Sequence, residues 1–62
     1  MNAQLLTAED VADQLNVSVQ VVYRLVARRE IGSVRIANGR ALRFTPENVT
    51  DYIRTREIPA AK

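Results

Sequence analysis

Residues 7–28 read TAEDVADQLNVSVQVVYRLVAR, and this stretch decides the fold. Thr7 and Ser18 are favourable helix N-caps, because their hydroxyl groups can accept hydrogen bonds from the unpaired N–H groups of a first helical turn. Only a short helix, at about residues 8–15, fits between these two caps. Asn16 falls where the chain must turn, and Asn adopts the left-handed conformation more readily than most residues. We therefore predict two helices joined by a tight turn.

The second helix, predicted at about residues 19–29, has two distinct faces. Val22, Leu25 and Val26 have the i, i+3, i+4 spacing that is typical of a buried stripe. The opposite side carries amide, phenol, guanidinium and methyl groups and no acid, from Gln20, Tyr23, Arg24 and Ala27, with Val19 and Arg28 at its margins.

That outward side has the chemistry that the DNA major groove requires. Arginine can bond guanine, glutamine can bond adenine, and apolar groups can contact thymine methyls. A solvated amphipathic helix would show the same hydrophobic pattern, but a merely solvated face usually mixes both signs of charge. We therefore predict major-groove contacts from this helix, by Ser18, Val19, Gln20, Tyr23, Arg24 and Arg28.

The composition excludes several classes of function. The 62 residues include no cysteine and no histidine, and the net charge is +2. A disulfide or a thiolate metal site is excluded, and the commonest general base is missing, so we expect neither enzymatic activity nor a metal ion or cofactor. No apolar run approaches the roughly 20 residues of a membrane span, and no signal peptide is visible. We expect a location in the cytoplasm or nucleoid, without membrane contact.

The charge is unevenly distributed along the chain. Residues 1–19 carry net −3, residues 20–43 carry six arginines against one glutamate for net +5, and residues 44–62 are neutral. Eight of the nine basic residues are arginine, whose planar guanidinium group suits forked contacts to phosphates and bases. The excess positive charge therefore lies in the second helix and the segment that follows it.

Residues 33–44 alternate apolar and polar side chains around Asn38-Gly39, which predicts a β-hairpin. A two-residue loop would pair Val34 with Arg43. A three-residue loop, residues 37–39, would instead collect the large apolar side chains on one face, namely Val34, Ile36, Leu42 and Phe44. Because a one-residue slip moves every side chain to the other face, we predict the three-residue loop, with Gly39 left-handed and Arg35 and Arg43 pointing outward.

This hairpin is a candidate second DNA contact. It contains three arginines and no acid, which favours contact with phosphates or the minor groove over a hairpin that is only solvated. The predicted contact residues are Arg35, Asn38, Gly39, Arg40 and Arg43.

A last helix is predicted at about residues 46–56. Thr45 can cap it, and Pro46 occupies the first helical position, where its missing N–H group costs nothing. Val49, Tyr52 and Ile53 form its expected core stripe.

Four segments in this order, residues 6–18, 22–26, 33–36 and 44–49, resemble MerR-like winged helix-turn-helix domains of the excisionase type. The resemblance covers about residues 5–57. It implies a mainly α fold with a small β-hairpin, as one DNA-binding domain over residues 1–62 with an ordered core of about 5–57. At this length, with no effector or dimerisation domain, the chain resembles phage excisionases (recombination directionality factors), most closely the actinobacteriophage type.

Such a resemblance implies an architectural role on double-stranded DNA. Several copies would bind a phage attachment site cooperatively, bend it, and direct a tyrosine-family integrase toward prophage excision. The family's recognition-helix positions match Val19, Gln20, Tyr23 and Arg24, and its wing positions match Arg35 and residues 38–43. Asn16 stands at a turn position where the family often has glycine, and this is a mild change. Arg29 stands just after the second helix, where the family also often has glycine, so the end of that helix is expected to differ.

Two other functions remain open from the sequence. A small transcriptional regulator of a phage or prophage could use the same fold. A protein-interaction module could use the basic face to bind an acidic partner.

Overall fold

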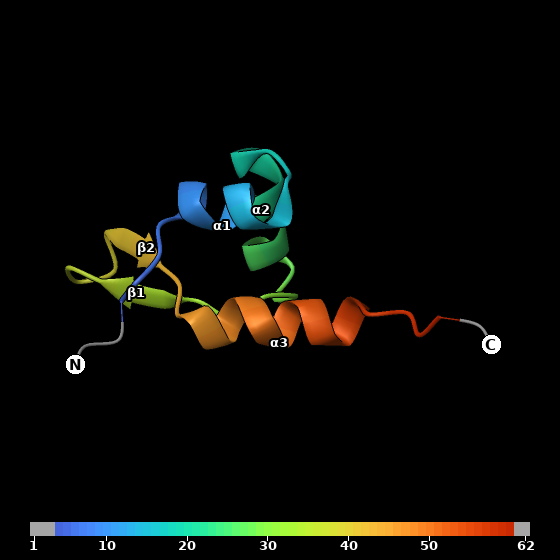
Figure 1. Cartoon of the computed structure of the whole chain (residues 1–62). Helices are drawn as coiled ribbons and strands as arrows, with labels where there is room; N and C mark the ends of the chain where they lie inside the picture. Colours follow the sequence, from blue (N-terminus) through green and yellow to red (C-terminus); the bar gives the residue numbers. More distant parts are fainter. Residues whose placement is uncertain (1–3, 61–62) are drawn as a thin grey trace.

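The computed structural model describes residues 4–60, so residues 1–3 and 61–62 of the predicted domain lie outside the described range. The element order is α1 (Ala8–Leu15), α2 (Val19–Ala27), β1 (Val34–Ile36), β2 (Ala41–Arg43) and α3 (Pro46–Arg56). Helices α1 and α2 lie together on one side, α3 runs along the other side, and the β1–β2 hairpin lies at one end (Figure 1). This arrangement is a winged helix-turn-helix, mainly α with a small antiparallel hairpin, as predicted.

Local caps explain where α1 begins and ends. The Thr7 hydroxyl accepts a hydrogen bond from the Asp10 N–H group, and the Asp10 carboxylate accepts one from the Thr7 N–H group, each at 3.0 Å. At the other end Asn16 is left-handed, with φ 59°, as predicted. The Val17 N–H group then donates to the Ala12 carbonyl at 3.0 Å, which closes the helix. This short turn leaves α1 and α2 in direct succession.

Helix α2 ends at Ala27, so the predicted end at residue 29 is wrong. Arg29 adopts the left-handed conformation, with φ 61°, and the Glu30 N–H group donates back to the Leu25 carbonyl at 2.9 Å. These features form a Schellman motif, whose left-handed position is usually glycine. The prediction extended the helix to Arg29, whereas this arginine takes the left-handed position that terminates the helix.

The predicted register of the hairpin is also wrong. Val34 lies opposite Arg43, and Ile36 lies opposite Ala41, so residues 37–40 connect the strands where a three-residue loop was predicted. Residues directly opposite each other project to the same face. Arg35 and Arg43 therefore do not share an outward face, because Arg43 is on the side of Val34.

The turn chemistry and the small size of the sheet account for this register. Three successive residues are left-handed, Ala37, Asn38 and Gly39, with φ values of 52°, 57° and 83°. Only Gly39 was predicted to be left-handed, and that prediction is confirmed. Alternation of apolar residues constrains the register only where one face is buried. Strand β1 is not such a case, because Val34 and Ile36 are half-buried and are not part of the core.

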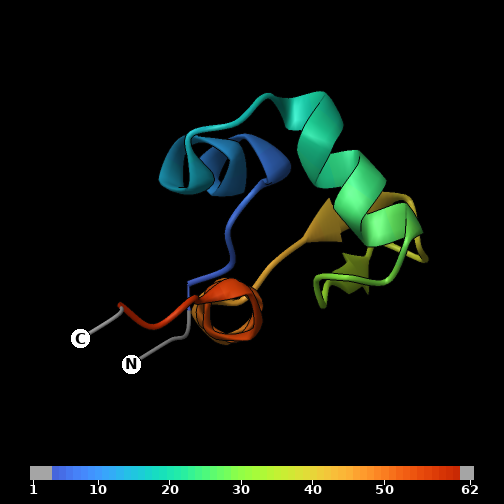
Figure 2. The same ribbon diagram turned by 90° about the vertical axis from the view of Figure 1, so that its right-hand side faces the viewer.

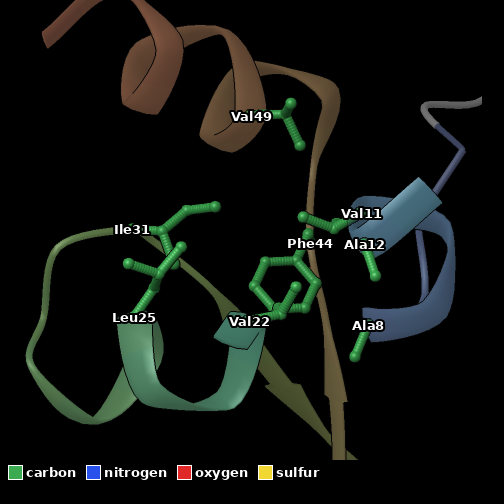
Figure 3. Close-up of a cluster of buried hydrophobic side chains, with 8 residues drawn as sticks. All are labelled: Ala8, Val11, Ala12, Val22, Leu25, Ile31, Phe44 and Val49. Carbon is green, nitrogen blue, oxygen red and sulfur yellow. The ribbon is translucent and has the colours of Figure 1, made fainter. Parts of the chain in front are cut away.

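The core is a single apolar cluster around Phe44 (Figure 3). Its most deeply buried side chains are Phe44, Val11 and Val22, and its other members are Ala8, Ala12, Leu25, Ile31 and Val49. The backbones of Leu6 and Phe44 also pair with each other, through N–H to carbonyl hydrogen bonds of 2.7 and 2.8 Å. The segment before α1 is thereby held against the end of the hairpin, a contact that the sequence pattern did not indicate.

Helix α3 begins as predicted at the cap Thr45, whose hydroxyl accepts a hydrogen bond from the Asn48 N–H group at 3.0 Å. The predicted core stripe is partly wrong. Val49 is buried and Tyr52 packs against the core, but Ile53 is 45% exposed. The core of so short a chain covers only a narrow strip of α3, and Ile53 lies beyond it.

Helix α3 also holds the connector between α2 and β1. The Arg56 guanidinium group donates to the Glu30 carboxylate at 2.8 Å and lies 5.1 Å from the centre of the Tyr52 ring. The hydrogen bond to Glu30 raises the pKa of Arg56 above its ordinary value, with a smaller contribution from Tyr52. At Gly32 a Cβ atom would lie 2.7 Å from the side-chain nitrogen of Asn48, so a larger residue there would require the Asn48 side chain to shift.

Candidate nucleic-acid interface

The outward face of α2 consists of four exposed residues, Gln20, Tyr23, Arg24 and Ala27. Tyr23 is 51% exposed although it is a large aromatic residue. Val19, predicted at the margin of this face, is half-buried and packs against the core, so it offers only part of its side chain. The face is therefore polar, lacks acids and is narrower than predicted.

The residues at the two ends of α2 are exposed, and they also cap the helix. The Ser18 hydroxyl accepts a hydrogen bond from the Val21 N–H group at 3.3 Å, which fixes the start of the helix. Arg28 is the C-cap residue, and its side chain is 67% exposed. Its guanidinium group lies 3.9 Å from the Glu30 carboxylate, so part of its charge is compensated within the protein.

A hollow of about 340 Å³ lies between α2 and the hairpin, and we call it the Tyr23 groove. Its lining residues come from the start of α1, from α2 and from β2: Thr7, Ala8, Glu9, Tyr23, Arg40, Ala41, Leu42 and Arg43. It brings together the predicted major-groove residue Tyr23 and the predicted wing residues Arg40 and Arg43. The residues of α1 were not predicted from the sequence, because their approach to the hairpin depends on tertiary packing.

Arg40 and Arg43 differ in how available their charges are. Arg43 is half-buried, and one of its guanidinium nitrogens donates to the Leu42 carbonyl at 2.8 Å. Arg40 is exposed and forms no ion pair with any residue in the described range 4–60. Arg40 therefore presents the freer guanidinium group at the Tyr23 groove.

The remaining predicted wing residues lie elsewhere on the hairpin. Asn38 and Gly39 are exposed in the turn that connects the strands. Arg35 is exposed on β1 and lines a second hollow, separate from the Tyr23 groove. In Figure 2, which looks along α3, the C-terminal end of α2 overlaps the hairpin in projection, and residues of α2 and of the hairpin together line each of the two hollows.

Within residues 4–60, the structure contains no group of three or more metal-ligating side chains of the histidine, cysteine or acidic type. In the same range, no helix has the length and apolar character needed to cross a membrane.

A comparison with known protein families identifies the family of this chain. The family model described as a helix-turn-helix domain matches residues 5–57. The chain belongs to the helix-turn-helix domain family. Membership in this family implies DNA binding; its domains are typically non-enzymatic and occur in excisionase-like proteins. No curated protein and no solved structure shows a significant match to the chain.

For this helix-turn-helix protein, Arg40→Ala is expected to weaken binding to all duplex sequences alike and to flatten the salt dependence of the affinity. The reason is that Arg40 is an exposed, unpaired cation at the edge of the Tyr23 groove, suited to a backbone phosphate. Fluorescence anisotropy with specific and random duplexes at several salt concentrations measures both effects. Unchanged affinity and salt slope in both Arg40→Ala and Arg43→Ala would remove the hairpin from the DNA interface.

Proposed function

We propose that α2 enters the major groove of duplex DNA while the hairpin contacts the adjacent backbone or minor groove of the same duplex. The observation that carries this proposal is the Tyr23 groove, in which Tyr23 of α2 and Arg40 and Arg43 of the hairpin line one continuous hollow. Both elements lie in the segment of residues 20–43, which carries the excess positive charge.

Within this surface we assign base contacts to exposed side chains of α2. Gln20 and Arg24 have the amide and guanidinium groups that pair with adenine and guanine edges. Arg28, Arg40 and Arg43 lie at the periphery, where contacts to phosphates position the protein without reading the sequence. Ser18 and Val19 contribute chiefly by fixing the start of α2, since one caps it and the other packs inward.

We further propose that the protein is an architectural excisionase. Several copies bind an attachment site side by side, bend the DNA and favour excision by a tyrosine-family integrase. Two observations support this role: the ordered resemblance of residues 5–57 to excisionase-type domains, and the family match over the same residues. Bending and positioning of DNA require no catalytic group, in keeping with the polar, arginine-rich surface of α2 and the hairpin.

A gel-shift titration tests this role. The duplexes are the attachment site of the genome that encodes the chain, a promoter from the same genome and a random sequence. A ladder of slow complexes with anomalous, bend-dependent mobility on the attachment site alone is the expected result. A single compact complex at the promoter, with none at the attachment site, would contradict the excisionase role and indicate a transcriptional regulator. No complex on any duplex at low salt would contradict DNA binding by the basic face.

A further inference from the structure

A second hollow, of about 390 Å³, lies between the C-terminal end of α2 and β1, and we call it the Arg29 hollow. Its lining residues are Val26, Arg29, Ile31, Gly32, Ser33 and Arg35. The Tyr23 groove runs along β2, whereas the Arg29 hollow runs along β1. Each strand of the hairpin is therefore flanked by its own arginine-lined hollow.

The positive charge in the Arg29 hollow is not compensated by a neighbouring acid. Arg29 and Arg35 come from different parts of the chain, and neither forms an ion pair within residues 4–60. Glu30 follows Arg29 in the chain but does not line the hollow, because its carboxylate is bonded to Arg56 at 2.8 Å. Two like charges that share one hollow favour an anion between them.

The backbone of Arg29 is held in an unfavourable conformation at this site. Its φ is 61°, a value that glycine adopts freely and that residues with a Cβ atom adopt at a cost. Strain of this kind persists where the surrounding structure enforces it, and it gathers at functional sites. Here the strained residue places a guanidinium-bearing side chain at the wall of the hollow.

We propose that the Arg29 hollow binds a phosphate group of the DNA backbone, in addition to the phosphates contacted from the Tyr23 groove. Arg29 and Arg35 supply charged N–H donors, and the Ser33 hydroxyl supplies a neutral donor on the same wall. The inference rests on the proposed binding of duplex DNA by α2 and the hairpin, and it adds Arg29 and Ser33 to Arg35, which the sequence already predicts as a DNA contact. A phosphate contact of this kind requires no preference for one DNA sequence.

The test is Arg29→Gly, assayed on a random duplex. Glycine relieves the left-handed strain, so the melting temperature of the free protein is expected to rise by about 4 °C. The same change removes one charged donor, so the affinity is expected to fall about tenfold. The log–log salt slope is expected to become shallower by about 0.9, the value for one lost phosphate contact. Higher stability with weaker binding cannot result from unfolding.

Arg54→Ala is the matched control. It also removes one positive charge, from an exposed arginine of α3 that lines neither the Tyr23 groove nor the Arg29 hollow. It is expected to leave the salt slope unchanged. An Arg29→Gly variant that binds the random duplex like the wild type, or loses no more than Arg54→Ala, overturns the proposal.

A titration with inorganic phosphate separates free phosphate from DNA as the ligand. The amide NMR signals of Gly32 and Ser33 report on the hollow. If inorganic phosphate shifts them while Arg29→Gly leaves duplex affinity intact, the hollow binds a free anion and the proposal is wrong. If the excisionase role is wrong, the protein has no preference for the attachment site, but the results with the random duplex are unchanged. Failure of the excisionase role can therefore be distinguished from failure of the phosphate contact in the Arg29 hollow.

Discussion

Phe44→Ala is expected to destabilise the fold by about 3–5 kcal/mol, the range for removing a fully buried aromatic side chain. Phe44 is completely buried and lies among core side chains from α1, α2 and α3 (Figure 3). A domain of 62 residues has a total free energy of unfolding of only about 3–9 kcal/mol at typical values per residue. The loss is therefore expected to remove at least about a third of the total stability, and at the lower end of that range it leaves the variant unfolded at room temperature. Urea denaturation followed by circular dichroism measures the loss.

Phe44→Leu is the control for this experiment, because it keeps most of the apolar volume and the backbone pairing with Leu6. It is expected to cost about 1 kcal/mol and to retain a cooperative transition. If Phe44→Ala melts cooperatively within a few degrees of the wild type, then Phe44 is not the centre of the core.

Arg24→Ala is expected to cost about 1–3 kcal/mol at the specific site, or roughly 5- to 150-fold in affinity. Arg24 is exposed on the outward face of α2 and forms no ion pair within residues 4–60, so its guanidinium group is free to bond a guanine edge. The sequence preference at one position of the site should relax. Competition between duplexes that differ at single base pairs measures the change.

Arg24→Lys separates base reading from charge. It keeps the positive charge but lacks the fork that bonds two acceptors of guanine, so it should lose sequence preference while retaining the salt slope. An equal loss of affinity for specific and random DNA in Arg24→Ala would instead identify Arg24 as a phosphate contact.

The helix starts were predictable from the sequence because capping is local chemistry. Thr7, Ser18 and Thr45 each accept a hydrogen bond from a backbone N–H group three residues later, and that relation is visible in the sequence. The pairing of Leu6 with Phe44 was not predictable in the same way, since it joins residues far apart in the chain.

In the hairpin, the alternation of apolar and polar residues did not predict the strand register. Its register follows from successive left-handed residues at the turn, including Ala37, for which the sequence offers no such signal. The apolar alternation pointed to a different register because it assumed a buried face that β1 does not have.

The candidate interface was predictable in part. The exposed residues of α2 follow from its 3.6-residue period, and Gln20, Tyr23 and Arg24 are exposed as expected. The two hollows were not predictable, because they form where α1 and α2 meet the hairpin. One signal for Arg29 was present: no glycine follows α2 directly, so another residue had to take the left-handed position.

The most direct test of DNA binding by α2 and the hairpin is the salt dependence of the affinity for duplex DNA. If the outward face of α2 and the hairpin together neutralise about four to six phosphates, the logarithm of the affinity should fall against the logarithm of salt concentration with a slope of about −4 to −5. Anisotropy titrations with a short duplex across a range of salt concentrations measure this slope. A slope in that range supports DNA binding by this surface, and a flat response would contradict it.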